Sequence, residues 1–307
     1  MRYGARVTSE RGARSPGEEA LIRQLIVAHD LGTSGDKASL HDASGRLMAS
    51  HTAHYPTDFG PGGKAEQEPA DWWSAFCATT RALLVETGTR PDEIACVVMS
   101  GQMMGAVLID AADEAVRPAL IWADTRAQEE THAIGEIVGY ERGYRLLGHP
   151  IDSTCSLPKL MWLREHDPEA WARTTGVVLA KDFVTLRLTG RRCIDPSDAS
   201  GTNAYDQVAG RWSDEMLGAA GIDRELLPEV RPSASVAGTV SKDVAAESGL
   251  REGTPVVVGG ADGCTSALGV GLVSTDSSAV ATIGSSAWIS VASDELILMG
   301  YNTPVHN

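Results

Sequence analysis

The sequence predicts an α/β fold in which strands and helices alternate. Three short apolar runs at residues 25–28, 38–40 and 47–55 are joined by tight turns that contain glycine, an order typical of a β-meander. Two further runs, at 94–99 and 255–258, are rich in β-branched residues and predict buried strands. The long stretch between these two runs contains helical periodicity, so strands and helices share one chain.

The first helix is predicted from its start signal, its apolar spacing and its stop signal. Pro69 suits the first turn of a helix, because an N–H group there would have no partner, and Gly88 suits a helix end. Between them, Trp72, Trp73 and Phe76 recur at helical spacing. We therefore expect a helix from Pro69 to Gly88.

The rest of the chain supplies one hairpin and a series of shorter helices. Apolar runs at 106–109 and 115–121 flank a turn of Asp and Ala residues, which suggests the hairpin. A final strand is expected at 280–283. Helices are expected over 124–138, 157–166, 168–174, 181–189 and 241–249, with a last one, rich in small residues, that ends near Gly271.

The composition is that of an ordinary globular protein with a strong acidic excess. The 307 residues are 43% hydrophobic and 22% charged, which suits one large domain or two smaller ones. The net charge of −15 argues against nucleic acid or an anionic membrane as the main partner. Small phosphorylated ligands stay compatible with this charge, because backbone N–H groups and a metal ion can hold them.

The cysteines and the N-terminal segment bear on the compartment. The five cysteines are scattered without a CxxC pair, which favours reduced thiols in a cytoplasmic protein. No apolar run approaches the ~18 residues of a membrane span. Residues 1–23 contain five arginines and no apolar core of a secretory signal, so we interpret them as a disordered leader.

The first candidate site follows the first strand. Asp30 ends the strand; Gly32, Thr33 and Ser34 are small enough to let backbone N–H groups approach an anion, and Lys37 follows. A carboxylate beside a phosphate would repel it unless a divalent cation such as Mg²⁺ lay between them. Gly-Thr-Ser-Gly is also a common turn composition, so a simple hairpin turn is the alternative.

The second candidate is Asp262, which follows the buried strand at 255–258 and precedes a helix rich in Ala and Gly. A carboxylate that is fixed and partly desolvated in this place suits a general base that takes a proton from a hydroxyl group. The alternative is an ordinary capping residue at the start of that helix.

Two further segments contain side chains suited to a polyol. Gln102 can hydrogen-bond hydroxyl groups, and Met103 and Met104 can line a pocket wall, although a role in the core and a turn fits them equally well. Asp124 lies in the segment Trp122–Arg126, where carboxylate and aromatic groups suit sugar hydroxyls and C–H surfaces. In the alternative, Asp124 caps the following helix and the arginine of this segment is solvated.

A weak internal echo links the two ends of the chain. The segment Asp30–Ser34 after the first strand resembles the segment after the last strand, which contains Gly284, Ser285 and Ser286. Two such strand–turn units fit two related domains that face one ligand. Coincidence among small residues is the alternative.

These segments occur in the order found in the FGGY carbohydrate kinases, which the chain resembles over about residues 26–292. Within that family the motifs are most similar to those of the xylulokinases. Eight short motifs in register form a far more specific signal than one glycine-rich loop. The motifs are Asp30–Lys37, Gly101–Gly105, Trp122–Arg126, Pro158–Trp162, Lys181–Phe183, Ser197–Thr202, Trp212–Asp214 and Gly259–Asp262.

The resemblance implies the two-domain actin-like, ribonuclease H-like ATPase fold, in which each domain contains a mixed five-stranded sheet flanked by helices. It implies a complete sugar-binding N-terminal domain at residues 24–272 and the start of a truncated nucleotide-binding domain at 273–307. It also implies ATP-dependent phosphorylation of a ketose or polyol hydroxyl group with Mg²⁺. Activity is then expected to require the missing part of the second domain.

The same resemblance assigns roles to individual residues. Asp30 is implied as the acid associated with Mg²⁺, and Asp262 as the catalytic base. The implied contacts to the nucleotide phosphates are Asp30, Gly32, Thr33, Ser34, Lys37, Gly284, Ser285 and Ser286. The implied substrate pocket contains Gln102, Met103, Met104, Asp124, Asp262 and Gly263.

Two residues depart from the xylulokinase pattern. That group carries His at the position of Met104 and Asn at the position of Gly263, and both positions contact sugar there. Loss of two hydrogen-bonding side chains alters substrate discrimination strongly. A different ketose, or a polyol such as a tetritol or pentitol, is therefore an alternative to D-xylulose. His29, next to Asp30, is interpreted as a neighbour of the site and not as a catalyst.

Two other functions stay open at this level. One is a non-catalytic sugar-binding or regulatory module descended from such a kinase, although the presence of both Asp30 and Asp262 favours catalysis. The other is an actin-like ATPase without a sugar substrate, which the segments Gln102–Met104 and Trp122–Arg126 disfavour. The expected partners are a small sugar or polyol and a second copy of the chain in a homodimer, with no nucleic acid and no membrane.

Overall fold

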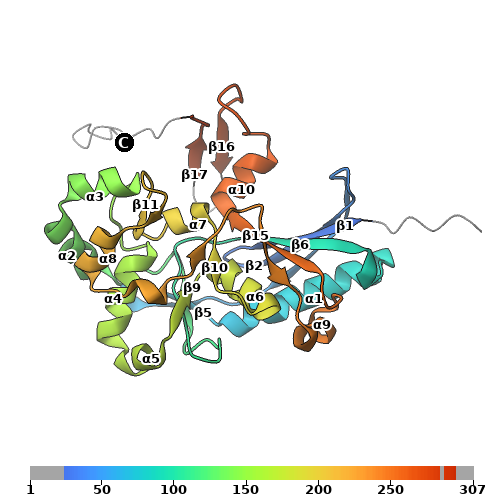
Figure 1. Ribbon diagram of the computed structural model, residues 1–307, viewed down its shortest axis with the longest axis horizontal. Helices are drawn as coiled ribbons and strands as arrows, with labels where there is room; N and C mark the ends of the chain where they lie inside the picture. Colours follow the sequence, from blue (N-terminus) through green and yellow to red (C-terminus); the bar gives the residue numbers. More distant parts are fainter. Residues whose placement is uncertain (1–23, 284–286, 295–307) are drawn as a thin grey trace, which may run out of the picture.

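A six-stranded mixed sheet forms the centre of the molecule (Figure 1). The structure is a computed structural model that describes residues 24–283 and 287–294. The strands lie in the order β14-β15-β6-β1-β2-β3; β1, β6 and β15 run parallel, and the other three run antiparallel to their neighbours. They are β1 (Leu25–Leu31), β2 (Gly35–His41), β3 (Leu47–His54), β6 (Ile94–Gly101), β14 (Val236–Thr239) and β15 (Pro255–Ala261).

The predicted α/β fold is confirmed by these strands, which include the β-meander of β1, β2 and β3. The sheet has six strands and not the expected five, because the short strand β14 pairs with the outer edge of β15. Burial alternates along β1, so Leu25, Val27 and Leu31 belong to the buried core on one face of the sheet.

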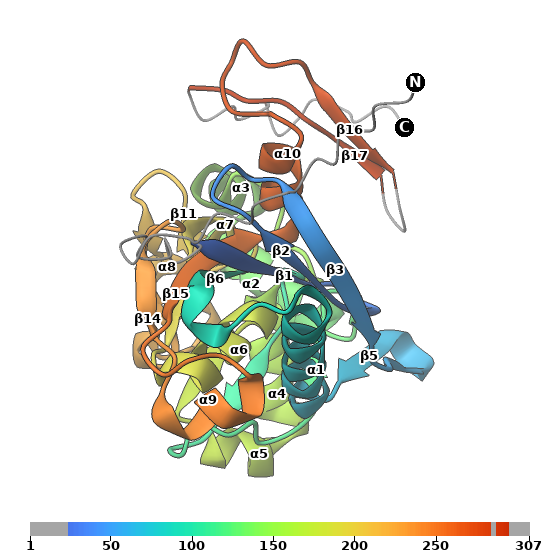
Figure 2. The same cartoon turned by 90° about the vertical axis from the view of Figure 1, so that its right-hand side faces the viewer.

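Helix α1 (Pro69–Thr87) packs against β2 and β3, and α6 (Ala180–Thr189) and α9 (Lys242–Ser248) also contact it; both lie to the left of α1 in Figure 2. The predicted limits of α1 are confirmed. Its first turn contains the proline, and Gly88 ends it with φ of 63°, a left-handed conformation that glycine adopts without strain. Trp72 from this helix is 1% exposed and belongs to the core of the sheet.

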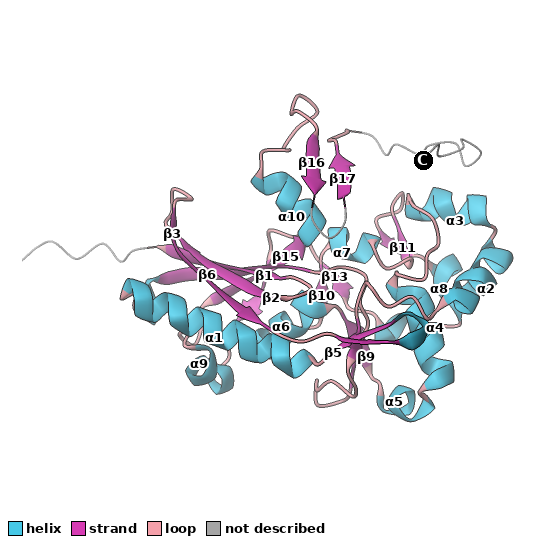
Figure 3. Cartoon of the chain, turned by 180° about the vertical axis from the view of Figure 1, so that it is seen from behind, coloured by secondary structure: helices cyan, strands magenta, loops and turns pink. Residues whose placement is uncertain are grey.

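A second group of helices, with a core of its own, lies beside the sheet (Figure 3). The sequence pattern does not predict α3, because its eight residues lie between two glycines that read as breaks. The α2 helix begins at residue 128, later than expected. The group comprises α2 (Gln128–Val138), α3 (Tyr140–Leu147), α4 (Ser156–His166), α5 (Pro168–Arg173) and α8 (Asp214–Ala220).

The expected hairpin forms with a change of partner. Isolated bridges join Ala106 to Leu120 and Ile109 to Ala115, while strand β7 pairs with β9. Short strands and a one-turn helix surround the central sheet. They are β4 (Asp58–Gly60), β5 (Lys64–Gln67), β7 (Val107–Ile109), β8 (Ala119–Leu120), β9 (Gly176–Val178), β10 (Cys193–Ile194), α7 (Pro196–Ser200), β11 (Tyr205–Asp206), β12 (Arg211–Trp212) and β13 (Glu229–Val230).

After β15 the chain enters α10 (Asp262–Gly269) and the antiparallel pair β16 (Val280–Ile283) and β17 (Ala287–Ser290), which stand away from the sheet in Figure 1. The expected small-residue helix and final strand are thus confirmed. The predicted phosphate contacts at 284–286 lie outside the described residues. Within the described ranges, no helix is long and apolar enough to cross a membrane.

Candidate active site

Three candidate side chains lie at the same edge of the central sheet. Strands β15, β6 and β1 are parallel neighbours, so their carboxyl ends meet there. The register sets Gly101 opposite Ala261, so that Gln102 and Asp262 follow adjacent strand ends, and β1 brings Asp30 to the same edge. Sheets of this kind commonly bind ligands at the carboxyl ends of their parallel strands.

Asp30 presents an exposed carboxylate at the end of β1. Desolvation by the surrounding protein raises its pKa, the negative charge of Asp36 raises it further, and the positive charge of Lys37 lowers it. Lys37 is its partner across the β1–β2 pair. An additional cation at this edge would also lower the pKa of Asp30, because it would favour the ionised form.

Asp262 is the first residue of α10 and is half-buried. Desolvation raises its pKa, the N–H of Gly263 donates to Oδ1 at 2.6 Å and lowers the pKa, and the charge of Asp30 raises it. The two predicted carboxylates therefore lie within electrostatic range of each other. The alternative role of Asp262 as a helix cap is wrong, because Ala261 holds the N-cap position of α10.

A close backbone contact between β15 and β6 precedes Asp262 in the chain. The register between β15 and β6 shifts between Val257 and Gly260, which marks a bulge. Gly259 has φ of 82° there, and a Cβ atom on it would lie 1.8 Å from the carbonyl oxygen of Met99. Only glycine fits this position, because it has no side chain to clash and adopts a positive φ freely.

The loop after β1, at residues 32–35, forms a hairpin turn, as the alternative interpretation expects. It also hydrogen-bonds to the candidate substrate segment Trp122–Arg126. The N–H of Gly32 donates to the carbonyl oxygen of Gly35 at 3.0 Å and closes the turn. Nε1 of Trp122 donates to Oγ1 of Thr33 at 2.8 Å, while Ser34 is exposed. The candidate phosphate loop thus contacts the segment that begins at Trp122.

Gln67, which the sequence gives no reason to single out, joins two of these segments. Its Nε2 donates to the carbonyl oxygen of Thr33 at 2.6 Å, and its Oε1 accepts from Gln102 at 2.8 Å and from Trp72 at 3.0 Å. Gln102 is 2% exposed, and its Oε1 has no hydrogen-bond donor within the described part of the chain. This oxygen is an available acceptor behind the edge.

Met103 and Met104 follow Gln102 and pack over the end of α7. A Cβ atom on Gly201 would lie 3.0 Å from Cε of Met103 and 3.2 Å from Cγ of Met104. Met104 has φ of 60°, an uncommon conformation for a residue with a side chain. Its sulfur lies 3.9 Å from Oγ1 of Thr154.

Lys159 holds the backbone of Met104 in this conformation. The lysine is fully buried, and its Nζ donates to the carbonyl oxygens of Met104 at 2.9 Å, of Ile121 at 2.8 Å and of Thr154. Burial lowers the pKa of Lys159 to about 7. Three loops, two of them with candidate substrate residues, thus meet at one amine. The sequence places Lys159 in a family-like motif but does not indicate this role.

Asp124 is fully buried and paired. Its carboxylate accepts from the N–H of Ala65 at 2.9 Å and from the Arg126 side chain at 2.6–3.1 Å. The guanidinium of Arg126 also donates to Glu66 at 2.6 Å and stacks 4.2 Å from the ring centre of Trp162. Both parts of the alternative are wrong: α2 begins further along the chain, so Asp124 does not cap it, and Arg126 is not solvated.

His29 points away from the edge. It is 2% exposed, and its ring nitrogens lie 2.9 Å from Oδ2 of Asp36 and 3.2 Å from Oγ1 of Thr80. Its ring lies 4.2 Å from that of Phe76, on the face that α1 covers. The histidine is therefore a structural neighbour of the candidate site, as interpreted from the sequence.

Gly263 differs from these tightly held residues. It is half-buried, and a Cβ atom on it would meet no other atom of the described residues within 4 Å. The position therefore accepts a larger side chain without a clash. Among the predicted substrate residues, Gly263 and Met104 are the two that depart from the xylulokinase pattern.

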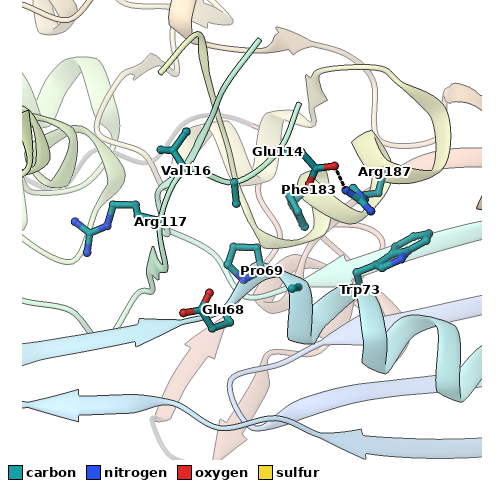
Figure 4. Close-up of a pocket in the computed structure, with 10 residues that line it drawn as sticks. Glu68, Pro69, Trp73, Glu114, Val116, Arg117, Phe183 and Arg187 are labelled. Carbon is teal, nitrogen blue, oxygen red and sulfur yellow. Dashed lines mark hydrogen bonds and ion pairs between the residues drawn. The ribbon is translucent and has the colours of Figure 1, made fainter. Parts of the chain in front are cut away.

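Two cavities lie against the sheet and its helices. One, of 370 Å³, is lined by α1, α6 and the hairpin turn, with Trp73, Phe183 and Arg187 among its residues (Figure 4). None of the predicted site residues that the structure describes lines this cavity. The other, of 510 Å³, lies between α10 and strands β1, β6 and β15, and includes Cys264 and Leu268. It adjoins the helix that begins with the candidate base.

A separate group of side chains could hold a metal ion in the helical part of the molecule. Ligand atoms of Glu130, Glu165 and His166 lie within 4.8 Å of one another, on α2 and α4. These helices do not contribute to the sheet edge. The metal candidate at that edge is Asp30.

Residues 25–269 match the family model described as the N-terminal domain of the FGGY family of carbohydrate kinases. The chain belongs to this family. It is 35% identical over 251 residues to the xylulose kinase of Lactococcus lactis, covering 82% of this chain and 50% of that protein. It is 32% identical over 262 residues to that of Escherichia coli, covering 85% and 53%. The FGGY chain therefore spans about half the length of these curated relatives.

Solved structures of FGGY-type kinases share the fold. Xylulose kinase from Rhodospirillum rubrum matches with a TM-score of 0.82 at 25% identity, over 87% of this chain and 55% of that one. Gluconate kinase from Lactobacillus acidophilus matches with a TM-score of 0.81 at 25% identity, over 87% and 54%. The predicted actin-like fold of the FGGY kinases is thus confirmed.

Proposed function

We propose that this FGGY chain supplies the sugar-binding half of an ATP-dependent kinase that phosphorylates a hydroxyl group of a ketose or polyol. The observation that carries the proposal is that Asp30 and Asp262 lie at the carboxyl ends of parallel strands, where the charge of Asp30 raises the pKa of Asp262. Family membership supports the reaction class. Phosphoryl transfer requires mainly positioning and charge stabilisation from the protein, with little covalent chemistry.

In this proposal Asp262 is the base that takes the proton from the sugar hydroxyl group. Its raised pKa strengthens it as a proton acceptor, because a base of higher pKa holds the proton more tightly. The N–H of Gly263 fixes Oδ1 of this carboxylate at 2.6 Å, which leaves Oδ2 for the hydroxyl group. The chain's contribution is thus a positioned base at an edge that a bound sugar can reach.

Asp30 fits a magnesium ion. Mg²⁺ prefers oxygen ligands and usually takes one or two carboxylates together with water and phosphate oxygens. Asp30 offers an exposed carboxylate whose pKa is raised by desolvation and by Asp36. A bound cation would stabilise the ionised form of this carboxylate and so lower its pKa. When bound, the ion would neutralise charge on the phosphates of ATP. The proposed phosphate contacts of the chain are Gly32, Thr33, Ser34 and Lys37, with Gly284, Ser285 and Ser286 outside the described residues.

The substrate class is inferred from the side chains behind the edge and from the relatives. The names of the relatives, xylulose kinase and gluconate kinase, indicate that these proteins act on polyhydroxylated molecules. Met103 and Met104 are half-buried and offer an apolar wall, and Oε1 of Gln102 is an unpaired acceptor, among the described residues, that is buried behind the edge. Asp124 acts through its partners and not by direct contact, because it is fully buried. With Met104 and Gly263 unable to supply the xylulokinase-type hydrogen bonds, a ketose or polyol other than D-xylulose is proposed alongside it.

The domain organisation belongs to the same proposal. We infer a sugar-binding domain at residues 24–272 and the start of a nucleotide-binding domain at 273–307, supported by the family match over 25–269. Turnover would then require the rest of the second domain. We also propose that the protein lies in the cytoplasm and that two copies of it form a homodimer.

A coupled assay of ADP release over a panel of ketoses and polyols tests the function, with this chain and with any longer reading frame that contains it. Asp262→Asn should lower turnover about 10²- to 10⁴-fold, because the base is lost, and leave sugar affinity within about twofold. Asp243→Asn is the matched control, since Asp243 also lies in the first turn of a helix but is exposed on α9.

The outcomes separate the alternatives. Full-rate turnover by Asp262→Asn would reject its role as base. Sugar binding without turnover in the longer form, with Asp262 intact, would favour the non-catalytic sugar-binding module. ATP hydrolysis that no sugar stimulates would favour the actin-like ATPase.

A further inference from the structure

A buried cluster of charged side chains lies directly behind the candidate active site. Nζ of Lys181 lies 2.5, 3.0 and 3.1 Å from carboxylate oxygens of Asp182, Asp195 and Asp198. All four side chains are at most 1% exposed. Lys181 and Asp182 belong to α6, whereas Asp195 caps α7 and Asp198 lies in its first turn. The cluster therefore joins two elements that are separate in the chain.

Stability does not explain this cluster, which contains one cation for three carboxylates. Burial raises the pKa of Asp182 and of Asp198, because the protein interior disfavours their charged forms. Oδ2 of Asp182 and Oδ1 of Asp198 have no hydrogen-bond donor within the described ranges. Buried ion pairs contribute little net stability compared with apolar residues of the same volume. The cluster therefore points to a requirement other than stability.

From the cluster, a chain of hydrogen bonds reaches the backbone next to Asp262. Oδ2 of Asp195 accepts from the backbone N–H of Ser197 at 2.8 Å and from its hydroxyl group. Because the hydroxyl proton points to Asp195, a lone pair of Ser197 Oγ accepts the N–H of Ala261, at 3.0 Å. Ala261 is fully buried and is the residue that precedes Asp262.

The cluster contacts two strand ends that carry glycines, and the approach is closer at Gly101 than at Gly260. A Cβ atom on Gly260 would lie 3.4 Å from Oγ of Ser197 and 3.8 Å from Oδ2 of Asp195. A Cβ atom on Gly101 would lie 3.1 Å from Cβ of Lys181. The ends of β15 and β6 thus rest on the cluster, and Ser197 also lines the 510 Å³ cavity beside α10.

We propose that Ser197 is a positioning residue for the proposed catalytic base and that Asp195 and Lys181 hold it in place. The inference rests on the proposed function, because it assigns Ser197 the task of fixing the backbone from which Asp262 projects. Ser197 acts through the N–H of Ala261 and does not touch the reacting groups. Precise placement matters for this chemistry, since a shift of ~1 Å can cost about 10²-fold in rate.

Kinetics of three variants test the role. Ser197→Ala removes the acceptor and should lower kcat about 10- to 100-fold with KM within about twofold, because the sugar contacts are untouched. Ser197→Thr keeps the hydroxyl group and should keep kcat within about threefold of wild type. Ser248→Ala is the matched control and should leave kcat unchanged: Ser248 is fully buried and its Oγ accepts the N–H of Leu250, but it lies in α9.

Amide hydrogen exchange on the same chain gives a readout that needs no turnover. In Ser197→Ala, exchange of the Ala261 N–H should accelerate about tenfold or more, because its buried acceptor is gone. Ser197→Thr and Ser248→Ala should leave that rate unchanged. An unchanged Ala261 rate in Ser197→Ala, or an equal fall in kcat in Ser248→Ala, would overturn the positioning role.

The two proposals fail in different ways. If wild-type protein phosphorylates no sugar in the panel, the proposed function fails, and the exchange rate still decides whether Ser197 fixes Ala261. If wild-type protein is active and Ser197→Ala retains full kcat, the kinase assignment stands and the positioning role is rejected.

Discussion

Replacement of Lys159 by methionine tests how the candidate pocket is held together. Nζ of Lys159 is fully buried and donates to the carbonyl oxygens of Met104, Ile121 and Thr154. Methionine has a similar length and volume but no donor. Lys159→Met therefore leaves three buried carbonyl groups without their partner and, at the same time, removes a buried amine.

Two opposing terms set the magnitude. Each buried acceptor left unpaired costs about 2 kcal/mol, so three cost about 6 kcal/mol. Against this, the fall in the pKa of Lys159 from 10.5 to about 7 corresponds to about 5 kcal/mol that burial of the ammonium group costs below pH 7. The variant is free of that cost. We therefore expect Lys159→Met to lower the free energy of unfolding by only about 1 kcal/mol at pH 6.

The sign of the pH dependence follows from the lowered pKa. Between pH 7 and 10.5 the folded protein binds fewer protons at Lys159 than the unfolded chain does, so the stability of the wild type rises with pH in this window. The wild type gains about 3 kcal/mol between pH 7 and pH 9, and the variant lacks this gain. The loss of stability in Lys159→Met should grow to about 4 kcal/mol at pH 9.

Urea unfolding at pH 6 and at pH 9 measures both values, with Lys242→Met, at an exposed lysine of α9, as the control. An equal loss at the two pH values would mean that Lys159 stays charged throughout, and it would refute the lowered pKa. Sugar affinity gives an independent measure at pH 6. It should fall about tenfold or more despite the small change in stability, because the loops of Met104 and Ile121 are released together.

Three further changes probe the edge and the pocket. Gly259→Ala should lower the free energy of unfolding by about 3 kcal/mol or more in urea, because its Cβ would lie 1.8 Å from the carbonyl oxygen of Met99; an unchanged midpoint would contradict the bulge. Gln67→Leu should lower kcat more than sugar affinity, because it frees the Thr33 loop; a change in affinity alone would place Gln67 in the sugar pocket. Met104→His with Gly263→Asn should raise kcat/KM for D-xylulose about tenfold relative to other sugars, and an unchanged ratio would exclude these positions from sugar recognition.

The strands and the first helix could be predicted because their signals are local. The apolar run after residue 24 and the β-branched run at 94–99 become β1 and β6, and Pro69 and Gly88 mark the limits of α1. Asp30 and Asp262 could be singled out for the same reason, since Asp30 ends a predicted strand and Asp262 follows the predicted strand at 255–258 after three small residues. By contrast, α3 escapes prediction, because its eight residues lie between glycines.

The supporting contacts of the site could not be predicted, because they join residues far apart in the chain. Gln67 meets a partner 35 positions away, Lys159 one 55 positions away, and Ser197 one 64 positions away. Patterns within a short stretch of sequence do not indicate which distant residues will form hydrogen bonds. They even mislead at Asp124, where an acid before a helix suggests a cap, although the folded chain pairs it with Arg126 and the N–H of Ala65.

The two positions that depart from the xylulokinase pattern are held to different degrees. Met104 is held by Lys159 at its carbonyl oxygen and by contacts of its sulfur, 3.9 Å from Oγ1 of Thr154 and from Sγ of Cys155, whereas a Cβ atom on Gly263 would meet no other described atom within 4 Å. The proposed base, in contrast, follows a backbone that Ser197 fixes through Ala261. Because a position with few contacts costs little stability when it changes, substrate preference can vary at Gly263 while the base and its supports stay in place. Substitutions at Gly263 should therefore alter the ratio of kcat/KM between sugars with little change in Tm, whereas Ser197→Ala should lower kcat for every sugar alike.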